Sequence, residues 1–154
     1  MRRVGLAALA LALGLGIAVA PGTARPDPPG AVDPTAGLVA QGFMVALLGG
    51  DLPTAEGLAA TPFSVDGAVA RDAPALHGLL SDLVAGGRLR GRRFLRLESM
   101  SAEAAIARFG PPPARVRDLA APRTVVALVR LSRGGVVLFV HRVGSFFRVV
   151  GVTD

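Results

Sequence analysis

The 154-residue sequence contains no cysteine, no tryptophan and no tyrosine, and it also lacks lysine and asparagine. Without cysteine the chain can form neither a disulfide framework nor a thiolate nucleophile or thiolate metal ligand. Without lysine, all 17 basic residues are arginine, a composition typical of a GC-rich genome. The sequence isoelectric point of about 11.6 therefore reflects arginine chemistry more than an affinity for polyanions.

The N-terminus has the pattern of a secretory signal. Arg2 and Arg3 precede an apolar run at 4–20 and small residues at 22–24. This predicts a signal peptide over residues 1–24, cleavage near Ala24, and export to the periplasm or the extracellular space. Export and the loss of two arginines argue against nucleic acid as a partner. A membrane role is predicted only if the segment stays uncleaved and tethers the chain.

After a Pro-rich linker at 25–32, one domain is predicted over residues 33–154. Aspartate or serine caps and hydrophobic periodicity predict helices at 33–48, 52–59, 73–85 and 101–109. Leu38 is expected on the apolar stripe of the first helix, with Phe43 and Leu47. Strands are expected at 61–67, 88–100, 124–131, 136–143 and 146–152. The predicted fold class is α+β, with N-terminal helices packed on a curved antiparallel sheet that ends in a three-strand meander.

Several short motifs in this order resemble those of one superfamily. They are Gly50-Asp51 after the first helix, Pro62-Phe63, and Gly144 followed by the strand at 147–150. The chain thereby resembles the nuclear transport factor 2-like superfamily, a cone-shaped fold that includes ketosteroid isomerase, over roughly residues 35–152. The resemblance implies a helix-covered cavity. It does not decide the chemistry, because the superfamily includes isomerases, dehydratases, hydrolases, transport factors and binding domains.

Residues suited to catalysis are scarce. An isomerase-type site needs a carboxylate and a phenol or protonated acid, and the chain has no tyrosine. Ser145 is near His141 in sequence, but no nucleophile-elbow motif surrounds it. His77 and His141 are the only imidazoles, so we predict no metal and no cofactor. A small enzyme of the ketosteroid-isomerase-like type, using a cavity carboxylate and arginine, remains the alternative to a binding domain.

An arginine-rich segment at 88–96 has two interpretations. On an extended strand, Arg88, Arg90 and Arg92 would lie on one side, with Arg96 further along. They would form either a patch for anions or acidic head groups, or a charged edge that blocks strand pairing.

The C-terminal meander is expected to have two apolar faces. Two-residue turns at 133–134 and 144–145 would pair Val129 with Leu138 and Val140 with Val149. The face of these four residues should receive the helices. The opposite face would hold Val126, Leu128, Arg130, Val137, Phe139, His141, Phe146, Arg148, Val150 and Val152, with His141 opposite Arg148.

That second face is too apolar for a plain solvent surface, which predicts an interface between two copies of the chain. Arg130, His141, Arg148 and Phe139 are the candidates for ligand or interface contacts. The sequence as a whole predicts an exported, non-catalytic binding or assembly domain, homodimeric and able to hold a small ligand.

Overall fold

The computed structural model describes residues 32–154. The predicted signal peptide at 1–24 and nearly all of the predicted linker at 25–32 lie outside the described residues. Within residues 32–154, no helix is both long enough and apolar enough to cross a membrane.

Three helices begin in the same way, with an aspartate cap and a proline in the first turn. They are α1 (Pro34–Gly49), α2 (Leu52–Leu58) and α3 (Ala73–Ala85). The carboxylates of Asp33, Asp51 and Asp72 accept hydrogen bonds from backbone N–H groups of the first turn at 2.9, 3.1 and 2.9 Å. These bonds satisfy amides that have no partner within the helix. The three predicted helices are confirmed.

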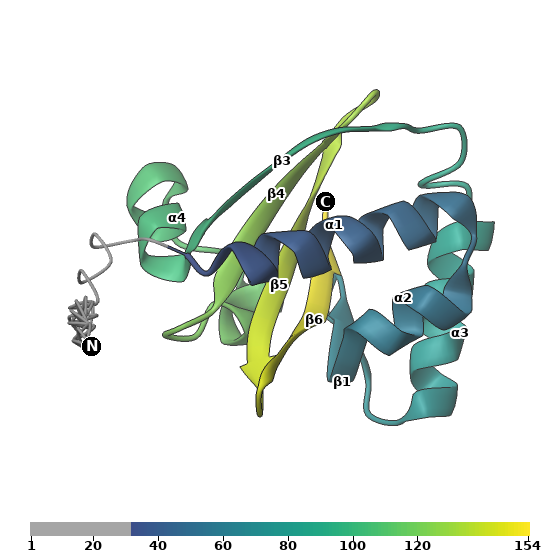
Figure 1. The fold of residues 1–154 in the computed structure, drawn as a ribbon, viewed down its shortest axis with the longest axis horizontal. Helices are drawn as coiled ribbons and strands as arrows, with labels where there is room; N and C mark the ends of the chain where they lie inside the picture. The colour runs from purple at the N-terminus through teal and green to yellow at the C-terminus, as the bar shows by residue number, and fades with distance from the viewer. Residues whose placement is uncertain (1–31) are drawn as a thin grey trace, which may run out of the picture.

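Six strands form one curved sheet (Figure 1). They are β1 (Ala59–Val65), β2 (Ala68–Ala70), β3 (Phe94–Ser101), β4 (Val125–Leu131), β5 (Gly135–Val143) and β6 (Phe146–Thr153). The order across the sheet is β2-β1-β6-β5-β4-β3, with β3 to β6 antiparallel and β1 parallel to β6. The α+β class and the C-terminal meander are confirmed. The sheet is mixed and not purely antiparallel, because β1 pairs in parallel with β6.

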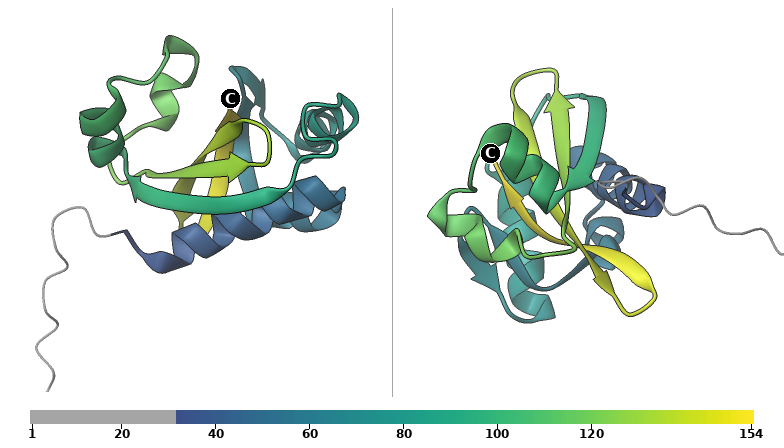
Figure 2. Two further views of the ribbon diagram at one scale, coloured as in Figure 1. Left: turned by 90° about the horizontal axis from the view of Figure 1, so that it is seen from above. Right: turned by 90° about the vertical axis from the view of Figure 1, so that its left-hand side faces the viewer.

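The sheet has helices on both faces (Figure 2). On one face α1, α2 and α3 enclose the main core, whose largest fully buried side chains include Phe43, Phe63, Leu80 and Leu138. The rings of Phe43 and Phe63 lie 5.8 Å apart at a tilt of 47°. On the other face lie α4 (Ala102–Phe109) and the 3₁₀ helix η1 (Ala114–Leu119), which pack over a second, smaller apolar cluster.

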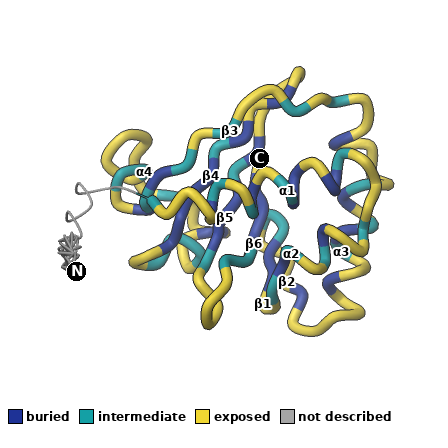
Figure 3. Tube along the Cα trace, viewed as in Figure 1, coloured by how far each residue is buried: buried dark blue, intermediate teal, exposed yellow. Residues whose placement is uncertain are grey.

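Two predictions about local structure are wrong. Leu38 lies on the outer side of α1 and is 68% exposed, while Ala36 and Ala40 are buried in the core. Buried and exposed positions recur along α1 (Figure 3). Small alanines are used there because α1 lies close to the sheet. The strand expected from residue 88 begins only at Phe94, because residues 86–92 form consecutive turns after α3.

The sheet register keeps the predicted faces apart from the end of β6, but not every predicted pair. His141 lies opposite Arg148 and Val140 opposite Val149, as expected. Val129 pairs with Val136 instead of Leu138, because the turn between β4 and β5 is centred on Ser132 and Arg133, one position earlier than expected, and is closed by a hydrogen bond of 3.1 Å from the Leu131 amide to the Gly134 carbonyl. A shift of two residues leaves every side chain on the same face.

A bulge in β6 changes the face of one residue. Phe139 pairs with Gly151 while Val140 pairs with Val149, so Val150 is the extra residue. Val150 packs in the second cluster, and Val152 then turns into the main core instead of the outer face. One extra residue reverses the alternation of a strand, which is why the prediction for Val152 is wrong.

Candidate functional site

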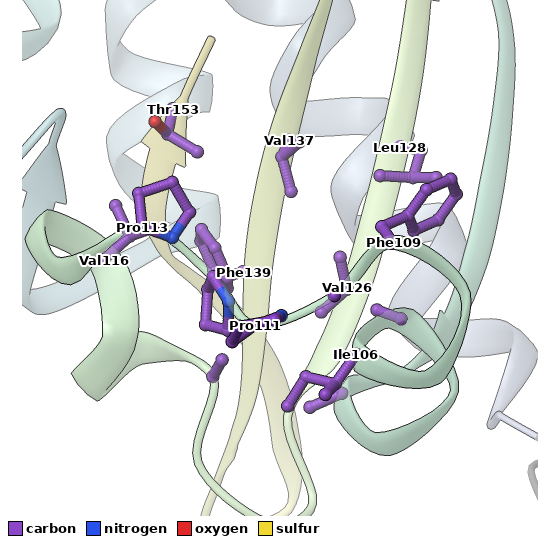
Figure 4. A pocket seen from close by; sticks show the side chains of 15 residues that line it. Ile106, Phe109, Pro111, Pro113, Val116, Val126, Leu128, Val137, Phe139 and Thr153 are labelled. Carbon is purple, nitrogen blue, oxygen red and sulfur yellow. The ribbon is translucent and has the colours of Figure 1, made fainter.

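A cavity of about 300 Å³ lies between the outer face of the sheet and the segment that covers it (Figure 4). Its lining is formed by Ala102, Ala105, Ile106, Phe109, Gly110, Pro111, Pro112, Pro113, Val116, Ala120, Val126, Leu128, Val137, Phe139 and Thr153. The sheet residues come from β4, β5 and β6, and the others from α4, the proline segment, η1 and Ala120 directly after η1.

The first part of the covering segment, α4, is fixed by contacts near its start and its end. At the start of α4, the Ser101 hydroxyl accepts a hydrogen bond from the Ala104 amide at 3.1 Å. Arg108, near the end of α4, forms an ion pair with Glu98 on β3. Gly110 then turns the chain with φ of 85°, and three prolines stiffen the path to η1. The small side chains of Ala102 and Ala105 leave the space beneath α4 unfilled.

The cavity has almost no polar chemistry. None of its lining residues carries an ionisable side chain. Its one side-chain hydroxyl, on Thr153, donates to Asp66 Oδ1 at 2.8 Å and lies 3.3 Å from Arg115 Nη2, which donates to it. The cavity can therefore enclose an apolar group, whereas a general acid or base would have to come from outside the lining.

Phe139, a predicted ligand or interface residue, forms part of the cavity floor and is 3% exposed. The apolar centre of the second face is covered by α4, the proline segment and η1 of the same chain. This removes the observation on which the predicted homodimer was based, since the face no longer needs a second copy to cover it. The homodimer itself remains a prediction.

His141 holds the end of the covering segment. Its Nε2 lies 2.9 Å from Thr124 Oγ1 and 3.0 Å from the Leu119 carbonyl at the end of η1. Thr124 also donates its hydroxyl proton to that carbonyl at 3.0 Å. If Nε2 carried a lone pair, that lone pair would face the lone pairs of the Leu119 carbonyl oxygen and repel them. The arrangement therefore requires a proton on Nε2, which is donated to the Leu119 carbonyl. His141 thus attaches η1 to the sheet.

The two arginine candidates of this face, Arg130 and Arg148, lie far from each other. The Arg148 guanidinium donates to the Phe147 carbonyl at 3.2 Å and lies over the ring of Phe146 at 5.4 Å. Arg130 is at the opposite end of β4 from Thr124, the residue that contacts His141. Six residues of extended chain separate the two positions by roughly 20 Å. Arg130 therefore belongs to a different surface from His141 and Arg148.

The arginines at 88–96 do not form one patch, because only Arg96 is in a strand. Arg88 pairs with Asp66 at 2.5 Å, Arg90 is exposed in a turn, and Arg92 is half-buried. Arg96 lies on β3 opposite Arg130. Two residues predicted for separate sites thus come together through the β3–β4 pairing.

Arg96 and Arg130 line a second hollow beside the apolar cavity. Glu98 and Arg108, which the sequence prediction missed, also line it. Phe109 and Leu128 line both hollows, so an apolar space and an arginine-rich space share a wall. The alternation of β3 places Arg96 and Glu98 on one face, but only the fold shows that α4 delivers Arg108 there.

A third polar cluster surrounds Asp66 in the turn between β1 and β2. Its Oδ1 accepts hydrogen bonds from the Thr153 hydroxyl at 2.8 Å and the Asp154 amide at 3.4 Å, and its Oδ2 accepts from Arg88. Burial acts to raise the pKa of Asp66, but the hydrogen bonds from Thr153 and Arg88 outweigh it and hold the pKa below its ordinary value of 3.8. The hydrogen bond to Asp66, together with the negative charges of Asp154 and Asp66, raises the pKa of Arg88.

We expect Asp66→Asn to lower the free energy of unfolding by about 1–2 kcal/mol at pH 7, because charge-assisted bonds to partly exposed arginine are weakened. A pKa lowered by folding contributes stability above the unfolded value, which is lost as pH falls through the folded value. Urea unfolding should therefore show the difference between variant and wild type shrinking below about pH 4. Asp118→Asn, at an exposed aspartate, is the control. An equal effect of both substitutions would contradict the role of Asp66.

No protein-family model, curated protein or solved structure matches this chain. The resemblance to the nuclear transport factor 2-like superfamily accordingly stays a prediction. The space beneath α1, α2 and α3, where such a cone would hold a ligand, is occupied by the fully buried side chains of the main core. The apolar cavity lies on the opposite face.

Proposed function

We propose that this chain is an exported, non-catalytic binding domain that holds the apolar part of one small ligand in the cavity beneath α4. The observation that carries the proposal is the lining of that cavity, which is almost entirely apolar and lies beneath a covering segment that leaves one side open to solvent. Its volume of about 300 Å³ is at the lower end of the range of small-molecule sites, which are mostly apolar and largely pre-formed.

The way the cover is attached supports a pre-formed site. The Glu98–Arg108 ion pair, the Ser101 cap and the His141–Thr124–Leu119 contacts secure three separate points of the cover. A cover held in this way loses little conformational freedom when a ligand enters, which favours affinity. The lack of an ionisable lining residue favours binding over the alternative of a small isomerase-like enzyme.

Titration of the full chain with the uncharged fluorophore N-phenyl-1-naphthylamine tests the proposal. We expect saturable binding of one molecule per chain and shifted methyl NMR signals of Val126, Leu128 and Val137. Leu80, buried on the other face of the sheet, is the internal control and should not shift. Absence of saturable binding, or signal changes that spare the three cavity residues, would overturn the proposed function.

A further inference from the structure

We propose that the ligand is amphipathic, with an oxyanionic head group, a carboxylate or a phosphate ester, held between Arg96 and Arg130. This inference rests on the proposed function and adds the chemical class of the ligand. It starts from the outer face of β4, where Val126, Leu128 and Arg130 follow one another at the two-residue spacing of a strand. The first two line the apolar cavity and the last two line the arginine-rich hollow.

The neighbouring strand repeats this gradient. On β3, Met100 belongs to the apolar cluster under α4, while Arg96 faces the same side four residues away. The β3–β4 register places Met100 beside Val126 and Arg96 beside Arg130. Although the two strands are antiparallel, the apolar residues of both lie at one end of this face and the arginines of both lie at the other end.

The two arginines are placed to accept an anion. Like charges directly opposite on a sheet repel each other. Arg108, the third arginine of the hollow, is already paired with Glu98. Within residues 32–154, neither Arg96 nor Arg130 has a carboxylate within 4.0 Å. An oxyanion between them would remove their repulsion and could accept paired N–H donors from each guanidinium.

The apolar cavity limits the rest of the ligand. At about 30 Å³ for each small group, the volume of a water molecule in the liquid, a 300 Å³ cavity takes roughly ten carbon atoms. Phe109 and Leu128 form the shared wall over which the chain would pass to reach the arginines. A medium-length alkyl chain with an anionic end matches both hollows at once.

Calorimetric titration of the full chain with decanoate, decyl phosphate and 1-decanol tests this inference. We expect at least one anion to bind about tenfold more tightly than the alcohol, equivalent to about 1.4 kcal/mol, with a difference that shrinks at high salt. The tighter of the two anions identifies the head group. An Arg96→Gln/Arg130→Gln double variant should bind anion and alcohol equally, while Arg71→Gln, at an exposed arginine far across the sheet, should behave as wild type.

The titrations distinguish failure of the head-group inference from failure of the proposed function. Equal affinity of wild type for both anions and the alcohol would overturn the head-group inference and leave the proposed function standing. An anion preference that survives in the double variant would also overturn it. If none of the three compounds binds, the proposed function itself fails. Unchanged alcohol binding by the double variant establishes that it is folded.

Discussion

A Val137→Trp variant is expected to lose at least about tenfold in affinity for N-phenyl-1-naphthylamine and for 1-decanol, because the indole occupies the cavity. Val137 is in the middle of the cavity floor, opposite Leu128 on one neighbouring strand and Thr153 on the other. Figure 4 shows its side chain pointing into the space under the cover. Filling an existing void should change stability by no more than about 1–3 kcal/mol.

The introduced tryptophan is itself the fluorescent reporter for this experiment, since the natural sequence contains no tryptophan. Blue-shifted indole emission will show that the new side chain is enclosed. Val69→Trp, on the edge strand β2 where Val69 is 52% exposed, is the matched control and should emit as in water and bind normally. Undiminished binding together with enclosed emission would contradict the cavity as the site. If the variant unfolds, Ala105→Leu fills the space from the α4 side.

Replacing Phe63 with alanine should cost about 3–5 kcal/mol of unfolding free energy, the largest effect we expect from a single substitution. Phe63 is completely buried between the sheet and the helices, and its ring packs against that of Phe43. Removing it leaves a cavity that the surrounding strands and helices cannot close, and it removes an aromatic pair. Domains of this kind are stable by only about 5–15 kcal/mol, so a large part of the total would be lost.

Urea unfolding followed by circular dichroism measures this loss, with Phe146→Ala as the matched control. Phe146 is 65% exposed near the tip of the β5–β6 hairpin, so its truncation should change stability by less than about 0.5 kcal/mol. Similar losses from the two substitutions would contradict the assignment of the main core to the helix-covered face.

The local signals of the sequence were sufficient for the helices and for the meander. Asp33, Asp51 and Asp72 each start a helix, because a carboxylate satisfies first-turn amides irrespective of the rest of the fold. The pairing of His141 with Arg148 follows from a short turn at Gly144, which fixes the register locally. The prediction of a strand over Arg88 to Arg92 was wrong, because arginines at alternate positions occur in turns as well as in strands.

The cavity was beyond prediction for a different reason. Phe139 was identified as a side chain on a second apolar face, but its environment depends on α4 and η1, which are distant from it in sequence. A strand pattern shows that a face is apolar and does not show what covers it. A second copy of the chain and a segment of the same chain satisfy the same pattern equally well.

Sequence alone determined the four α-helices and the three strands of the meander, with its two faces up to the bulge in β6, because caps, turns and period-two alternation act between residues close together in the chain. Only the tertiary structure decided that β1 joins β6 in parallel, that α4 and η1 cover the second face, and that Arg96 meets Arg130 beside an apolar cavity. These arrangements depend on burying apolar surface between distant segments, and that free energy depends on area rather than on sequence order.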